Sequence, residues 1–180
     1  MTRREMAKSI LVLVLICVVI SGTLSLVNSY TAPVIEEARI AREIASRKRL
    51  LMDTENFEEL TLKGAPESVT AAHKGTDAAG NLTGYVFTVK HKGFGGFITI
   101  IVAIDPSGKI VRVATMDVNS ETKTLGGLVA KADYTDQYIG KDETLTGVDG
   151  ITGATITSDA YEACIRDSFV AFKIAKGAVS

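Results

Sequence analysis

The longest uncharged segment of the chain lies close to its N-terminus and limits what that end can fold into. No Asp, Glu, Lys or Arg occurs between Ser9 and Ile35, and residues 10–20 are apolar throughout. A helix of about 20 apolar residues crosses the hydrocarbon layer of a membrane, and each Leu, Ile or Val near its centre favours insertion by about 0.3–0.6 kcal/mol. We therefore predict a transmembrane helix over residues 9–29, preceded by a short cytoplasmic N-terminus of residues 1–8.

The charges on the two sides of this segment predict its orientation. Arg3, Arg4 and Lys8 precede it, whereas Glu36 and Glu37 follow it. Because positively charged flanks stay in the cytoplasm, we expect a single-pass protein of the inner (plasma) membrane whose remaining chain lies on the non-cytoplasmic side.

A cleaved signal peptide is the alternative to an uncleaved anchor. Its apolar region would be shorter, and a cleavage site flanked by small residues would follow. Residues 21–23 and 27–29 read Ser-Gly-Thr and Val-Asn-Ser, which are poor cleavage sites. The sequence favours the anchor.

The rest of the chain has room for one compact domain. The formal net charge is -1, which gives no indication of nucleic-acid binding. Cys17 and Cys164 are far apart, and His73 and His91 lack metal-ligand spacing, so neither a disulfide nor a metal site is expected. We predict that both histidines lie on the surface.

The segment after the anchor changes its pattern twice. Residues 30–63 are predicted to form a membrane-proximal helix, with Pro33 in its first turn, and then a connector of weak periodicity. From residue 64 to 180 we expect the folded domain. Three runs rich in β-branched and aromatic residues predict an antiparallel meander over residues 82–90, 97–104 and 109–116.

Helices are predicted in the last third of the chain. Two short ones are expected at residues 128–131 and 133–138. Residues 159–176 then follow a helical pattern, with Asp159 and Glu162 resembling a capping box and Gly177 ending the helix. Cys164 lies on the apolar face and is expected to be buried and inert. The fold class is α+β.

Residues 149–158 concentrate two glycines, three threonines and a serine just before this helix. Small residues let a ligand approach the backbone, and a helix N-terminus offers free N–H groups to an anion. This composition fits a phosphate site. A Gly/Thr turn followed by an ordinary helix cap is the alternative, and local composition alone favours that alternative.

A resemblance goes further. The segment Asp149-Gly-Ile-Thr-Gly-Ala-Thr155 resembles the flavinylation pattern Asp-x-x-Ser/Thr-Gly-Ala-Thr of the FMN-binding domain family. In that family the last threonine is esterified to the phosphate of FMN by a flavin transferase. The resemblance implies covalent FMN on Thr155 and recognition positions at Asp149, Thr152, Gly153 and Ala154.

Two hydroxyls follow the pattern. The resemblance makes Thr157 and Ser158 candidate hydrogen-bond donors to the FMN phosphate, although helix capping also accounts for them.

The wider chain resembles the G subunit of Rnf complexes, which are ion-translocating ferredoxin:NAD⁺ oxidoreductases. The similar features are one span, a membrane-proximal helix, a Gly-Phe-Gly-Gly hairpin at residues 93–96, a segment at residues 120–126 and a helix after the pattern. The C subunit of sodium-pumping NADH:quinone reductase is a cousin. The resemblance implies an electron-transfer subunit whose partners are other membrane subunits with flavins and iron–sulfur clusters.

One segment departs from these relatives. They carry Glu-Thr-Pro-Gly-Leu-Gly, whereas this chain has Glu121-Thr-Lys-Thr-Leu-Gly126. Contacts to the flavin from Glu121, Thr122, Leu125 and Gly126 are therefore expected to be secondary.

No enzyme constellation competes with this interpretation. The chain lacks a G-x-S-x-G elbow, a phosphate-binding loop lysine and a G-x-G-x-x-G segment, and no catalytic residue is assigned. Two other functions remain open, a stand-alone flavoprotein anchored at the cell surface and a non-redox assembly module of the complex.

Overall fold

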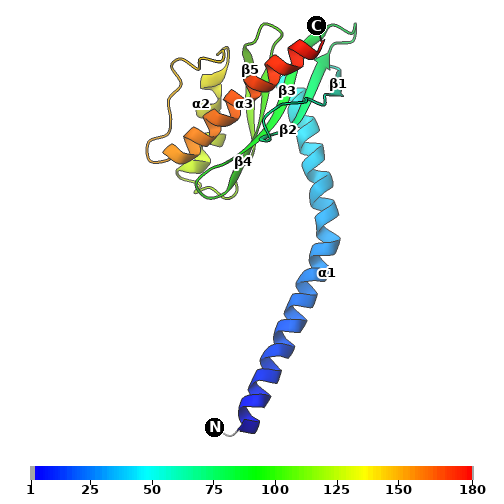
Figure 1. Ribbon diagram of the computed structural model, residues 1–180, viewed down its shortest axis with the longest axis vertical. Coiled ribbons are helices and arrows are strands. Elements are labelled where there is room, and N and C mark those ends of the chain that lie inside the picture. Colours follow the sequence, from blue (N-terminus) through cyan, green and yellow to red (C-terminus); the bar gives the residue numbers. More distant parts are fainter. Residues whose placement is uncertain (1–2, 180) are drawn as a thin grey trace. The chain divides into compact units, whose positions relative to one another are not determined.

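A computed structural model describes residues 3–179, with the side chains of residues 3–7, 9, 36, 39, 40, 178 and 179 outside the description (Figure 1). The chain divides into two compact units, Met1–Arg42 and Glu43–Ser180. Helix α1 (Arg3–Leu50) begins in the first unit and continues into the second.

The first unit is an apolar helix. Ile10–Ile35 is long and apolar enough to cross a membrane, and its apolar side chains are exposed, as a lipid-facing helix requires. The hydroxyls of Thr23, Ser29 and Thr31 each donate to the carbonyl oxygen four residues earlier. These bonds satisfy groups that hydrocarbon could not solvate.

Pro33 does not begin a helix, as predicted, but lies inside α1. Proline lacks the N–H of an interior helical residue, a loss that membrane-spanning helices tolerate. The anchor and the membrane-proximal helix are therefore one continuous helix. A first-turn proline and an interior one look alike in the sequence.

The second unit is built on an antiparallel sheet of five strands in the order β1-β2-β3-β4-β5. The last three strands are the predicted meander, and β1 and β2 lie in segments that we predicted as connector or left without structure. The strands are β1 (Asn56–Glu59), β2 (Val69–Thr76), β3 (Leu82–Lys92), β4 (Phe97–Ile104) and β5 (Ile110–Asp117).

Strand β2 shows why its segment escaped prediction. It reads VTAAHKGT, with few of the β-branched and aromatic residues that favour strands. Hydrogen-bonded neighbours on both sides, β1 and β3, hold it in place. His73 lies in this strand and is buried, so the predicted surface position was wrong.

Helix α3 (Thr155–Val179) crosses one face of the sheet and packs on β2, β3 and β4 (Figure 1). Its apolar face matches the prediction, since the expected residues are all buried: Tyr161, Cys164, Ile165, Ser168, Phe169, Phe172 and Ala175. All of them except Ser168 belong to the main hydrophobic core, together with alternate residues of the strands.

Both predicted ends of this helix were wrong. It begins at Thr155, four residues before Asp159, so Asp159 does not cap it, and Glu162 instead accepts hydrogen bonds from Arg166. Gly177 lies inside the helix. The start was missed because Thr155, Ile156 and Thr157 are β-branched, which weakens helix propensity.

The other face of the sheet carries a smaller core in which Leu50 and Leu51 pack on Val86, Ile101 and Ala103. A buried polar cluster lies on the same segment of α1. Glu43 Oε1 accepts hydrogen bonds from Arg47 Nη2 at 2.7 Å and Thr88 Oγ1 at 2.9 Å, and Arg47 Nη1 bonds His73 Nε2 at 2.7 Å.

Three short helices connect β5 to the loop before α3. They are η1 (Gly126–Ala130), α2 (Ala132–Thr135) and η2 (Asp136–Tyr138), close to the short helices predicted there. Tyr134, Tyr138 and Tyr161 pack with ring centroids 5.2–5.8 Å apart. This aromatic cluster joins the short helices to α3.

Candidate functional site

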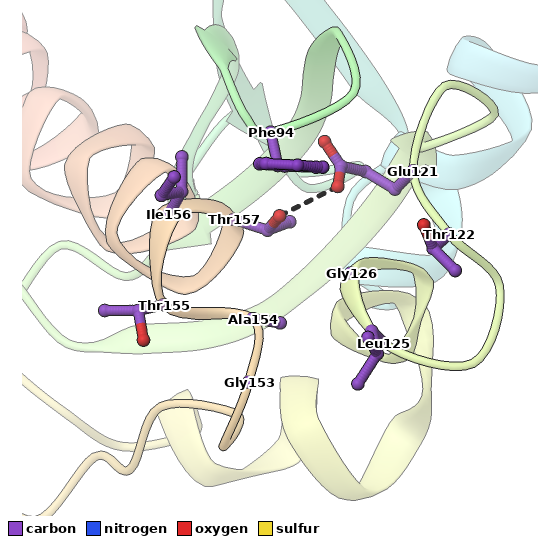
Figure 2. A pocket seen from close by; sticks show the side chains of 10 residues that line it. All are labelled: Phe94, Glu121, Thr122, Leu125, Gly126, Gly153, Ala154, Thr155, Ile156 and Thr157. Atoms are coloured by element: carbon purple, nitrogen blue, oxygen red, sulfur yellow. Dashed lines mark hydrogen bonds between the residues drawn. The ribbon is translucent and has the colours of Figure 1, made fainter.

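A cavity of about 430 Å³ opens at the N-terminal end of α3. Three segments that are distant in the sequence form its walls (Figure 2): the turn between β3 and β4, the segment that leads into η1, and the start of α3. The lining residues are Phe94, Glu121, Thr122, Leu125, Gly126, Gly153, Ala154, Thr155, Ile156 and Thr157. Its volume lies in the range of small-molecule and cofactor sites, about 300–1,000 Å³.

Glu121 joins the three walls. Its Oε2 accepts a hydrogen bond from Thr157 Oγ1 at 2.8 Å, and its Oε1 accepts one from the Gly95 N–H at 2.9 Å. The Glu121 side chain is buried, and a buried carboxylate is costly unless hydrogen bonds compensate it. The two bonds therefore fix the turn, the segment and the helix start relative to one another.

Glycines make room for this carboxylate. A Cβ added at Gly93 would lie 2.5 Å from Glu121 Oε1, and one at Gly126 would lie 2.3 Å from Oε2. A Cβ at Gly95 would lie 1.9 Å from the carbonyl oxygen of Ser120. The turn between β3 and β4 and the backbone at Gly126 approach Glu121 this closely only because the glycines there carry no side chain.

Thr155 is the first residue of α3, and its side chain is exposed at the edge of the cavity (Figure 2). Ser158 N–H donates to the Ala154 carbonyl at 2.9 Å, which is the first bond of the helix. The N–H groups before it in the first turn have no helical acceptor and carry the positive end of the helix dipole. This end of the cavity suits a phosphate.

The rest of the cavity rim is apolar, unlike the end at the start of α3. Phe94, Leu125 and Ile156 are apolar and are 72%, 44% and 56% exposed. Exposed large apolar side chains grouped at a cavity mark ligand or protein contact sites. One cavity thus combines an anion-binding end with apolar side chains that suit a flat aromatic ring.

The loop before α3 is held at both ends. Gln137 Oε1 accepts a hydrogen bond from the Asp149 N–H at 2.9 Å, and Gln137 Nε2 donates to the Asp149 carbonyl at 3.1 Å. Further on, Ser158 Oγ accepts from the Ile151 N–H at 2.9 Å. Gly153 has a φ of +83°, a conformation that favours glycine, and it turns the chain into the helix.

The structure brings most of the predicted site residues together. Eight of them line the cavity: Glu121, Thr122, Leu125, Gly126, Gly153, Ala154, Thr155 and Thr157. The segment at residues 121–126, expected to be secondary, supplies one whole wall. Asp149, Thr152 and Ser158 do not line the cavity; Asp149 and Thr152 are exposed, and Ser158 is buried.

Two lining residues were not predicted. Phe94 belongs to the hairpin turn at residues 93–96, and the local sequence does not indicate that this turn meets residues 121–126 and the start of α3. Ile156 follows Thr155 but points outward from α3, away from the apolar face on which the helix was recognised.

The histidine and cysteine side chains of the described residues do not line the cavity. No group of three His, Cys, Asp or Glu side chains among them could hold a metal ion. Burial raises the pKa of Cys164 to about 12, so its thiol stays protonated and unreactive.

The cavity lies within a part of the chain that is similar to known proteins. Residues 93–169 match the FMN-binding domain family, a range that includes every lining residue. The G subunit of the ion-translocating oxidoreductase complex of Methanosarcina acetivorans is 28% identical over 167 residues, covering 87% of this chain and 89% of the relative. The G subunit of the proton-translocating ferredoxin:NAD⁺ oxidoreductase complex of Clostridium ljungdahlii is 26% identical over 166 residues, covering 87% and 85%.

Two crystal structures share the fold. NqrC of Shewanella oneidensis superposes with a TM-score of 0.52 at 20% identity, over 72% of this chain and 74% of that one. The C subunit of the Na⁺-translocating NADH-quinone reductase of Parabacteroides distasonis gives 0.53 at 18% identity, over 71% and 79%. Residues 93–169 thus match the FMN-binding domain family, the globular unit shares the fold of these two proteins, and the chain is similar over most of its length to G subunits of ion-translocating oxidoreductases.

Proposed function

We propose that this chain is the electron-transfer subunit of a membrane-bound, ion-translocating oxidoreductase complex of the ferredoxin:NAD type, and that its FMN is esterified through the phosphate to Thr155. The exposed Thr155 hydroxyl carries this proposal, because it stands at the N-terminus of α3 and at the edge of a cavity of cofactor size. Its position in the pattern of residues 149–155 supports the same assignment.

The residues around Thr155 fit the phosphate and the ring system of FMN. N–H groups of the first turn of α3 would bind the remaining phosphate charge. Phe94, Leu125 and Ile156 would lie against the apolar ring system, and Glu121 keeps the walls in place. FMN, when bound, supplies the electron chemistry, while the protein sets its position and surroundings.

A covalent link to FMN suits a subunit that passes electrons between partners. Attachment through the phosphate leaves the far end of the cofactor free to meet donors and acceptors, and it keeps the cofactor at a high effective concentration in its site. No acid or base on the protein is required for such a role.

Mass spectrometry of the full chain from its native membrane tests the proposal. The expected result is the mass of one FMN, less one water, on the peptide that contains Thr155, and its loss in Thr155→Val. Thr146→Val is the matched control, because Thr146 is also exposed but lies outside the pattern. A native chain without FMN in an active complex would overturn the proposal and favour a non-redox assembly module.

The partners we propose are further membrane subunits that carry flavins and iron–sulfur clusters, together with a flavin transferase during maturation. The names of both G-subunit relatives support membership in a complex. Solubilisation in mild detergent should recover the chain with these subunits. Purification as a fully flavinylated protein without partners would favour a stand-alone surface flavoprotein.

We further propose that the N-terminus is cytoplasmic and the FMN-binding domain is on the other side of the membrane. The charges flanking the apolar segment support this orientation. Protease added outside sealed spheroplasts should cut the chain after Tyr30. If it never does so while cutting a known outward-facing protein, the orientation is wrong.

A further inference from the structure

Gln137 makes an uncommon pair of contacts. Its side-chain amide bonds both backbone groups of Asp149, accepting from the N–H at 2.9 Å and donating to the carbonyl at 3.1 Å. An amide that uses both of its functions on one residue fixes the orientation as well as the position of that residue. The side chain of Asp149 takes no part in the pair and is exposed.

The support beneath Gln137 is rigid. The next residue, Tyr138, is fully buried and packs on the rings of Tyr134 and Tyr161. The chain beyond it bonds the sheet, because Gly140 N–H donates to the Ile110 carbonyl at 2.7 Å. Gln137 therefore links the exposed loop at Asp149 to a segment that is packed in the core.

The loop it holds is the flavinylation pattern. Asp149 is the first residue of the pattern and Thr155 is the last. The far end is tied to α3 by the Ile151 N–H bond to Ser158 Oγ and is closed within the loop by the Ala154 N–H bond to the Ile151 carbonyl. At the near end, Val148 packs against the main core, and Gln137 adds the two bonds that fix the Asp149 backbone.

We propose that Gln137 is a positioning residue for FMN attachment: it holds the Asp149 backbone so that the Asp149 side chain and the Thr155 hydroxyl are presented together to the flavin-transferring enzyme. The inference rests on the proposed function. In the transfer, the Thr155 hydroxyl loses its proton and its Oγ bonds the flavin phosphorus. The phosphoanhydride bond of a flavin dinucleotide breaks, the nucleoside monophosphate leaves with the bonding electron pair, and the proton is released to water.

The test compares full-length variants in detergent, supplied with the transferase and a flavin dinucleotide. Gln137→Ala removes both contacts. Gln137→Glu keeps an acceptor for the Asp149 N–H but loses the donor to the carbonyl. Lys141→Ala is the matched control, since Lys141 Nζ donates to the Thr146 carbonyl at 2.6 Å and holds the same loop outside the pattern.

We expect Gln137→Ala to raise the KM for the chain about tenfold, because two hydrogen bonds to the Asp149 backbone are lost, and to leave kcat nearly unchanged. Gln137→Glu should fall between it and the wild type, and Lys141→Ala should match the wild type. Amide exchange at Asp149 should accelerate in Gln137→Ala, which a loss of stability elsewhere would not do selectively.

Two outcomes overturn the inference while leaving the proposed function intact. One is equal KM for Gln137→Ala and the wild type, and the other is unchanged exchange at Asp149. A wild-type chain that accepts no FMN on Thr155 removes the proposed function and this inference with it. If Gln137→Ala does not fold, the Gln137→Glu comparison decides.

Discussion

Thr157 donates a hydrogen bond of 2.8 Å to Glu121 across 36 positions of sequence, and both side chains are almost fully buried. The bond joins the first turn of α3 to the segment that follows β5. The same carboxylate reaches the turn between β3 and β4 through Gly95. The geometry of the cavity thus depends on one acidic side chain.

Thr157→Val should destabilise the globular unit by about 1–3 kcal/mol, because it leaves a buried carboxylate oxygen without its donor. Denaturant unfolding of the full chain in detergent measures this change. Thr155→Val is the matched control: its side chain is exposed, so its stability should stay within about 0.5 kcal/mol although FMN attachment is lost. Equal stability of the two variants would contradict the role given to the Glu121 contact.

Gly95→Ala should destabilise the chain by about 1–3 kcal/mol or more, as overpacking does, because its Cβ would lie 1.9 Å from the Ser120 carbonyl oxygen. Backbone cannot move aside as a flexible side chain can. Gly177→Ala is the control, since nothing lies within 4 Å of its added Cβ and alanine favours the helix by about 0.5–1 kcal/mol. Melting curves that shift alike for both variants would refute the close approach.

The parts of the fold that were predictable follow from local patterns. The apolar segment of α1 is recognised by its length, the three strands from residue 82 by their β-branched and aromatic residues, and the buried face of α3 by its helical period. Strand β2 has no such pattern, and only pairing with β1 and β3 makes it a strand. The start of α3 was hidden by β-branched residues.

Some residues of the site could likewise be proposed from local sequence, and others could not. Thr155 could be proposed from the sequence because its pattern is contiguous. Phe94 and Gln137 could not, since their roles depend on segments that meet only after folding. Glu121 was underestimated because the loop around it departs from its relatives, whereas the contacts it makes use its own carboxylate and not the altered residues.

His73 should make stability depend on pH. Arg47 can only donate, so His73 Nε2 accepts and the ring is neutral. Burial and the nearby Arg47 charge lower the pKa of His73 below the value near 6.5 of an exposed histidine, against the opposing charges of Glu59 and Glu43. Below pH 6.5 the unfolded chain therefore binds a proton that the folded chain does not, and stability falls as pH decreases toward the folded-state pKa.

The comparison with His73→Gln isolates this contribution, because glutamine can accept from Arg47 without titrating. Unfolding free energies at pH 7.5 and 5.5 should differ more for the wild type than for the variant. Equal differences would show that His73 does not cause the dependence.

Cys164 should resist alkylation in the folded chain, since it is buried and its pKa is raised to about 12. In a Cys17→Ser variant, where Cys164 is the remaining thiol, intact mass after treatment with N-ethylmaleimide should be unchanged until guanidinium is added. Rapid labelling of the native chain would mean that α3 leaves the sheet easily.

The place of Thr155 at the start of the last helix sets an order of events in the life of the protein. Strands β1 to β5 are synthesised first and can pair as neighbours, but the wall that carries Thr155 forms only when residues 155–179 have packed on them. A nascent or truncated chain lacks that wall. Under the proposed attachment at Thr155, only chains whose residues 155–179 have been made and folded would receive FMN.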